Sequence, residues 1–314
     1  MTAPLALAIL AVVLAWPVPI VLARATWTAR SPAAALLLWQ AIAIAGGLSM
    51  IGALLTFGLV PFGDDLVSGG VGFIAWMVGT APLRPVELWN ALALGGALLL
   101  TVHLLLNLLL TVVRAERQRR RHEQLLLLLS APIPAGGGAR LLDSPAPVAY
   151  CLPGALSSVT VVSAGLIALL DEPGMRAVIE HEKAHVRERH DIVLVLFRAW
   201  HTSLPWFPIA YRAQREVGLL IELLADDRAR RHVDDAVLAR AIAQVGAGRS
   251  EPRDATEWRD AASIDTVSIR IARLDPAVMP LPRALEGAIV AAAIGLVAVP
   301  TLLLLLPAVL SALA

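Results

Sequence analysis

The chain has 314 residues, of which 58% are hydrophobic and only 16% charged, and its mean hydropathy is +0.72. An apolar content this high excludes an ordinary soluble globular protein and predicts a membrane protein. The formal net charge of +1 gives no reason to expect direct binding of nucleic acid.

Four uncharged stretches are long enough to cross a bilayer, which takes about 20 helical residues. We predict transmembrane helices at about residues 3–23, 33–60 and 88–113, and a fourth at 287–314. The first is expected to be retained, because no basic segment precedes its apolar run as it would in a signal peptide. The stretch from Leu66 to Leu83 is apolar but short and rich in glycine, so we predict an external or re-entrant loop.

Basic residues set the expected orientation. Five arginines follow the third predicted span: Arg114, Arg117, Arg119, Arg120 and Arg121. By the positive-inside rule this cluster is cytoplasmic, and we interpret it as the flank of a span rather than as a site for anionic lipid or nucleic acid. The sequence therefore predicts a multi-pass protein of the cell membrane with its polar segment in the cytoplasm.

Residues 115–286 form that polar segment, which is large enough for one small domain. Short apolar runs at Val148–Leu152 and Ser158–Val162 are typical of strands, and the second could pair with an extended substrate. The predicted fold class is thus a multi-pass α-helical membrane protein with an inserted α+β domain. Its parts are residues 1–114 with three spans, the domain at 115–286, and the fourth span at 287–314.

A metal-binding pattern lies on a predicted helix from Glu172 to about His190, for which Asp171 is the expected N-cap. Helical spacing places His181 and His185 on one face, one turn apart, so both imidazoles can reach one ion. Glu182 lies on the adjacent edge, where its carboxylate can accept a proton from water instead of binding the metal. This is the HExxH pattern of zinc hydrolases, although chance alone produces it in roughly one chain in a hundred of this length.

A third metal ligand is needed, and the candidates are Asp191, His190 and Glu222. In an unbroken helix Asp191 and His190 lie about 9 Å and about 7.5 Å along the axis from His185, too far to share its ion. Glu222 lies on a second predicted helix, from about Ala213 to His232. Asp226, one turn later on the same face, can hold the other ring nitrogen of a ligating histidine.

The segment Ile192–Tyr211 joins the two parts of this site. A membrane crossing there would put Glu222 and His181 on opposite sides, so we predict a helix and turn that lie at the interface or pack in the domain. His201 and His232 are candidates for contact with the oxyanion or substrate, although an ordinary polar role is favoured for both. His103, inside the third span, is either functional or simply bonded to a neighbouring helix.

The order of these motifs resembles a family of membrane metallopeptidases. AYCLPG, then VTVVSAGLIALL, then HEKAH and a later ELLAD are similar to the BlaR/MecR-type gluzincins and, more distantly, to the HtpX and CAAX-prenyl-protease type. The resemblance implies a zincin-like domain in which His181, His185 and Glu222 bind one zinc ion. It also implies that Glu182 is general base and acid, and that Asp226 orients a ligand.

Two functions follow from this resemblance, and a third hypothesis comes from a different class. The favoured one is a regulatory zinc metalloendopeptidase that cleaves a cytosolic repressor of the BlaI type or a membrane-associated protein. The second is a protease for quality control of membrane proteins, and the third is a non-proteolytic signal transducer with a structural zinc site. The sequence leaves no room after the fourth span for the penicillin-binding domain of BlaR-type sensors, so we do not expect direct sensing of β-lactams.

Overall fold

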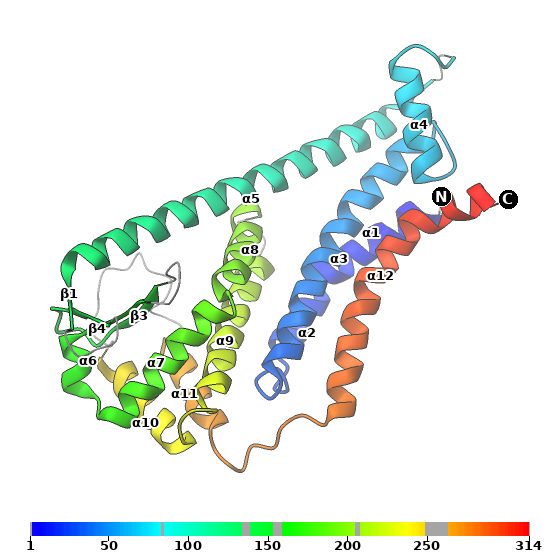
Figure 1. Ribbon diagram of the computed structural model, residues 1–314. Coiled ribbons are helices and arrows are strands. Elements are labelled where there is room, and N and C mark those ends of the chain that lie inside the picture. The colour runs from blue at the N-terminus through cyan, green and yellow to red at the C-terminus, as the bar shows by residue number, and fades with distance from the viewer. Residues whose placement is uncertain are drawn as a thin grey trace.

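The long apolar helices form one side of the molecule in the computed structural model, which describes residues 2–82, 85–133, 139–152, 159–204, 208–248 and 263–313. They are α1 (Thr2–Ala15), α2 (Pro17–Ala23), α3 (Pro32–Leu59), α5 (Leu88–Leu129) and α12 (Arg283–Leu313). Four segments are long and apolar enough to cross a membrane: α1 with α2, α3, α5 and α12. Helix α3 contacts both α1 and α12 (Figure 1).

Helix α4 (Leu66–Met77) replaces the loop that we predicted after the second apolar stretch. Asp65 caps it, accepting hydrogen bonds from the backbone amides of Val67 and Ser68. The glycines do not interrupt this helix but let it pack closely: a Cβ at Gly72 would lie 2.3 Å from the carbonyl oxygen of Phe62. With 12 residues the helix is about 18 Å long, too short to span a bilayer. Leu83, the end of the predicted loop, lies outside the described residues.

Helix α5 runs without a break for 42 residues, or about 63 Å, from Leu88 to Leu129. The predicted boundary near residue 114 therefore falls within a single helix. The five arginines lie on its exposed second half, and the helix ends where Ser130 begins the first strand. Figure 1 shows α5 as the element that leads from the apolar helices to the sheet. A continuous helix couples the orientation of the apolar helices to that of the sheet more rigidly than a loop would.

The sheet has four short strands: β1 (Ser130–Pro132), β2 (Arg140–Leu142), β3 (Ala149–Leu152) and β4 (Val159–Ser163). Their order is β1-β2-β4-β3, with β2 and β4 parallel and the other pairs antiparallel. Because β4 is central, both of its edges are paired, so the suggestion that this strand adds a substrate strand is wrong. Its predicted first residue, Ser158, lies outside the described residues.

Six helices complete the part that carries the HExxH pattern: α6 (Ala164–Leu169), α7 (Glu172–Arg187), α8 (His190–Ser203), α9 (Pro208–Ala229), α10 (Asp235–Gly248) and α11 (Ser263–Arg273). Helix α9 joins two apolar cores. Its residues Val217 and Leu220 pack with α2 and α3, whereas Ala229 packs with β3, β4, α7 and α10. The helix is therefore held by the apolar helices at one end and by the sheet-containing part at the other.

Helices α8 and α9 pack against each other and lie between α5 and α3 (Figure 1). The side-chain amide of Asn107 on α5 donates to the carbonyl oxygen of Ala199 at 2.8 Å and to the hydroxyl oxygen of Ser203 at 2.6 Å. Nε2 of His103 lies 3.1 Å from the carbonyl oxygen of Ser203, which confirms that this histidine bonds to a neighbouring helix. The predicted helix and turn at Ile192–Tyr211 is thus packed against other helices of the protein.

Candidate metal centre

Helix α7 presents the two histidines of the HExxH pattern toward α9. Asp171 caps the helix by accepting a hydrogen bond from the amide of Gly174 at 2.9 Å, and Pro173 occupies the first turn, where its missing N–H costs nothing. Ala177, His181 and Ala184 are the buried face of the following turns. The helix packs on α9 through this face, which brings the imidazoles against the second candidate helix.

The three candidate ligands meet between α7 and α9. Nε2 of His181 lies 3.4 Å from Oε2 of Glu222, Nε2 of His185 lies 3.6 Å from Oε1 of Glu222, and the two Nε2 atoms are 3.2 Å apart. Two bonds of about 2 Å at a tetrahedral angle place their ligand atoms roughly 3.3 Å apart. The ligand atoms of the three side chains lie within 4.8 Å of one another, close enough to hold a single ion.

Asp226 supports one of these imidazoles. Its side chain is 1% exposed, and Oδ1 lies 2.8 Å from Nδ1 of His181. A carboxylate can only accept, so Nδ1 carries a proton, and Nε2 is the ring nitrogen that faces His185 and Glu222. Nε2 is therefore the nitrogen that can bind a cation once its own proton is displaced.

Arg270, which the sequence analysis did not identify, completes this side of the cluster. It extends from α11 and is 14% exposed, with Nη1 at 3.1 Å from Oε2 of Glu222 and Nε at 2.8 Å from Oδ2 of Asp226. Its second terminal nitrogen, Nη2, donates to Oδ1 of Asp226 at 2.7 Å. No local pattern around Arg270 marks it, because it lies on a separate helix far along the chain.

The buried charges shift the pKa values of these groups in opposite directions. Burial lowers the pKa of His181, but hydrogen bonds to Asp226 and Glu222 outweigh this and raise it to about 9. Burial together with nearby positive charge lowers the pKa of His185 to about 4. Burial would raise the pKa of Glu222, yet its bond to His181 and the charge of Arg270 hold it well below its usual range. The carboxylates are thus anionic at neutral pH and suited to a cation.

Glu182 lies on the edge of α7 next to the cluster. Burial raises the pKa of the Cys151 thiol on strand β3, and the charge of Glu182 adds to this effect. The bond to Asp226 outweighs burial and raises the pKa of Arg270, to which the charge of Glu182 also contributes. Strand β3 contacts α7 and is an edge strand of the sheet. A carboxylate whose charge reaches both the candidate ligands and an edge strand can exchange a proton with a peptide bound there.

Comparison with known proteins identifies the chemistry. The model of peptidase family M48 matches residues 112–218 of the chain, a stretch that contains all of α7 and the HExxH residues. The chain is a metallopeptidase. The matched stretch ends before Glu222, so the place of Glu222, Asp226 and Arg270 in the site rests on their geometry. No curated protein and no solved structure matches the chain.

The HExxH helix of this metallopeptidase ends earlier than we predicted. Helix α7 stops at Arg187, and Arg189 adopts the left-handed conformation with φ of 52° and ψ of 43° before α8 begins at His190. The assumption of an unbroken helix to about His190 is therefore wrong. The turn brings His190 back against His185, with their Nδ1 atoms 3.1 Å apart. Asp191 points elsewhere: it is exposed, and its charge acts on Arg119 of α5.

The two other histidines singled out from the sequence lie outside the cluster of candidate ligands. His201 lies on α8, about 16 Å along the helix axis from His190, with its ring 5.8 Å from that of Tyr211. This distance speaks against contact with an oxyanion at the metal. His232 is 51% exposed and lies 3.7 Å from Oε2 of Glu180.

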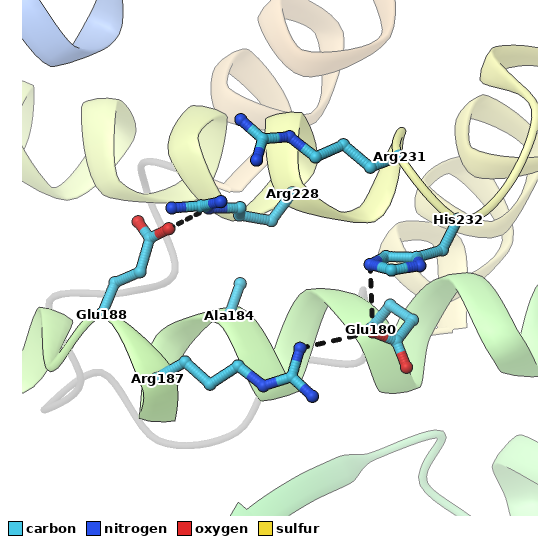
Figure 2. Close-up of a pocket in the computed structure, with 7 residues that line it drawn as sticks. All are labelled: Glu180, Ala184, Arg187, Glu188, Arg228, Arg231 and His232. Atoms are coloured by element: carbon cyan, nitrogen blue, oxygen red, sulfur yellow. Dashed lines mark hydrogen bonds and ion pairs between the residues drawn. The ribbon is translucent and has the colours of Figure 1, made fainter.

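A pocket of about 420 Å³ lies between α7 of the metallopeptidase and the end of α9. Figure 2 shows His232 at one end of it and the ion pair of Glu188 with Arg228 at the other. Its remaining lining residues are Glu180, Ala184, Arg187 and Arg231. His232 thus lies in the wall of this pocket and is half exposed.

Proposed function

We propose that this metallopeptidase is a membrane-embedded zinc endopeptidase that cleaves cytosolic or membrane-associated proteins. The observation that carries the proposal is the close approach of the ligand atoms of His181, His185 and Glu222, with Asp226 holding the first ring. Peptidases of family M48 generally use zinc, and two imidazoles with one carboxylate are a typical donor set for catalytic zinc.

Each residue then has one role. A zinc ion bound there would supply Lewis acidity, polarising the peptide carbonyl and making water a better nucleophile near neutral pH. Glu182 accepts a proton from the attacking water and then donates it to the leaving amine. Strand β3 offers its free edge to the backbone of an extended substrate. His232 contacts the substrate from the neighbouring pocket.

The four apolar segments support the membrane location. With the arginine-rich half of α5 in the cytoplasm, the metal centre lies on the cytoplasmic side. The order of three spans, inserted domain and final span is that of the BlaR/MecR type. It favours a regulatory peptidase whose substrate is a cytosolic repressor, for which a BlaI-type protein is the first candidate to assay. A quality-control protease would instead degrade unfolded membrane proteins without a preferred cleavage site.

The test compares the wild-type chain with Glu182→Gln in detergent micelles, measuring bound zinc and cleavage of a candidate repressor and of an unfolded membrane protein. We expect about one zinc per chain in both proteins, and a loss of cleavage of at least about 100-fold in the variant. Glu172→Gln, an exposed glutamate in the first turn of α7, is the matched control and should cleave normally.

Two outcomes would contradict the proposal. Cleavage by Glu182→Gln at the wild-type rate would remove Glu182 from catalysis. Stoichiometric zinc in a wild-type protein that cleaves neither substrate would favour the non-proteolytic transducer, because a structural zinc site needs no general base.

A further inference from the structure

His190 is the most buried histidine next to the proposed metal centre, and the proposed mechanism gives it no role. Its side chain is 4% exposed, and its ring lies 5.0 Å from that of His185 at an interplanar angle of 86°. Nδ1 of His190 is 3.1 Å from Nδ1 of His185, and Nε2 is 3.1 Å from Oε2 of Glu188. Both ring nitrogens of His190 are therefore engaged.

The left-handed residue Arg189 creates this arrangement. Among the residues that the structure describes, it is the one non-glycine residue with a positive φ, a conformation that L side chains adopt only at a cost. The turn reverses the backbone between α7 and α8, so that His190 packs against the preceding helix instead of continuing along it. Strain of this kind persists where the surrounding contacts require it.

The contacts from His185 through His190 to Glu188 form a series, and one arrangement of protons satisfies all of them. The carboxylate of Glu188 can only accept, so Nε2 of His190 donates to it and Nδ1 of His190 keeps a lone pair. That lone pair accepts from Nδ1 of His185, which leaves Nε2 of His185 unprotonated where it faces His181 and Glu222. This tautomer of His185 is the one that can bind a metal ion.

The far end of the series is fixed from another helix. Glu188 forms an ion pair with Arg228 of α9, at the wall of the pocket in Figure 2. Helix α9 also carries Glu222, so the ion pair fixes the turn that holds His190 to the helix that supplies the third candidate ligand. His185 thus has an orienting series of its own, separate from the Asp226 carboxylate that holds His181.

We propose that His190 and Glu188 are positioning residues that orient His185 for metal binding, as Asp226 does for His181. This inference rests on the proposed metal centre and extends it. Outer hydrogen-bond partners of this kind typically contribute a factor of 10 to 100 to metal affinity. A neutral His190 bonded to the Glu188 carboxylate orients His185 without placing a full negative charge in contact with this ligand.

The test uses the full chain in micelles and measures Zn²⁺ affinity by chelator competition, together with the visible absorption spectrum of the Co²⁺ form. His190→Phe keeps the ring but removes both bonds, and should weaken Zn²⁺ binding by about 10- to 100-fold while retaining the Co²⁺ coordination number. His190→Gln can accept from His185 and donate to Glu188, and should recover most of the loss. His122→Phe, a histidine on α5 outside the site, is the matched control.

Several results would overturn the proposal. Unchanged Zn²⁺ affinity in a folded His190→Phe would remove His190 from the support of the site. A lower Co²⁺ coordination number in that variant would make His190 a ligand instead. If His190→Phe does not fold, Glu188→Gln carries the same test, and an unchanged affinity there contradicts the role of Glu188. Failure of the wild-type chain to bind metal would instead reject the proposed function, and this inference with it.

Discussion

Arg270 encloses the carboxylate of Asp226, donating to both of its oxygens at 2.7 and 2.8 Å while Asp226 holds Nδ1 of His181. Helix α11 therefore reaches the proposed metal centre through one arginine. The next turn of the same helix repeats the contact: Arg273 donates to both oxygens of Asp227 at 2.6 and 2.8 Å, and to the carbonyl oxygen of Ala29 at 2.5 Å. The loop between α2 and α3 is thus tied to the helix that buttresses the site.

Asp226→Asn should weaken metal binding by about 10- to 100-fold, because the amide still accepts from His181 but no longer offers a full charge. It should also lower the stability of the metal-free protein, since Arg270 is left without its main buried partner. Zn²⁺ competition and thermal unfolding measure the two effects. Asp227→Asn is the control and should change stability without changing affinity; equal losses of affinity in both variants would contradict the role of Asp226.

Arg270→Gln and Asp226→Asn should not be additive. Removing one member of a buried ion pair typically costs about 3–5 kcal/mol, because the other charge remains unpaired, whereas removing both avoids that penalty. The double variant should therefore be more stable than the sum of the two single changes predicts, by at least about 1 kcal/mol. Chemical unfolding of the four proteins in the same detergent measures this, and additivity within roughly 0.5 kcal/mol would show that the pair does not interact.

The metal-free protein should be most stable near pH 6.5. The pKa of His181, raised to about 9, contributes stability that is present below its unfolded value and is lost as the pH rises toward 9. The pKa of His185, lowered to about 4, acts oppositely: stability is lost as the pH falls from about 6.5 toward 4, where the unfolded chain binds the extra proton.

Thermal unfolding of the chelator-treated protein between pH 5 and 9 checks this prediction. His181→Asn should flatten the alkaline side of the curve and leave the acid side in place.

Zn²⁺ affinity, in contrast to stability, should rise steadily with pH up to about 9, because the metal displaces the proton from Nε2 of His181. An affinity that is independent of pH in this range would argue against His181 as a ligand.

Asn107→Leu should loosen α8 from α5, since the amide of Asn107 provides the hydrogen bonds to Ala199, Thr202 and Ser203. Interhelical hydrogen bonds between apolar helices contribute about 0.6 to 1.7 kcal/mol each. We expect faster hydrogen exchange in α8 and a loss of about 1–2 kcal/mol in unfolding free energy. Thr101→Val is the control, because among the described residues the hydroxyl of Thr101 bonds within α5, to Ala97; an equal effect of the two changes would contradict the anchoring role.

The long apolar helices and the zinc-binding pattern could be predicted from the sequence because both depend on local order. Uncharged runs of sufficient length predicted the helices, and helical spacing put His181 with His185 and Glu222 with Asp226 on common faces. The prediction of a loop after Leu66 was misled by a local signal. The glycines there suggested a loop, yet they permit the close packing of α4 on Phe62.

Tertiary structure decided the surroundings of the site. No glycine marks the turn at Arg189, so the sequence predicted a continuous helix and placed His190 away from His185, although the two rings are in contact. Arg270 reaches the site from a helix that packs on α9, a relation that no spacing along the chain encodes. Likewise, β4 is central only because β2 and β3 pair on either side of it. The sequence alone thus determined the helices and the chemical types of the candidate ligands, because periodicity and composition are local. Contacts between distant segments determined which groups hold those ligands in place.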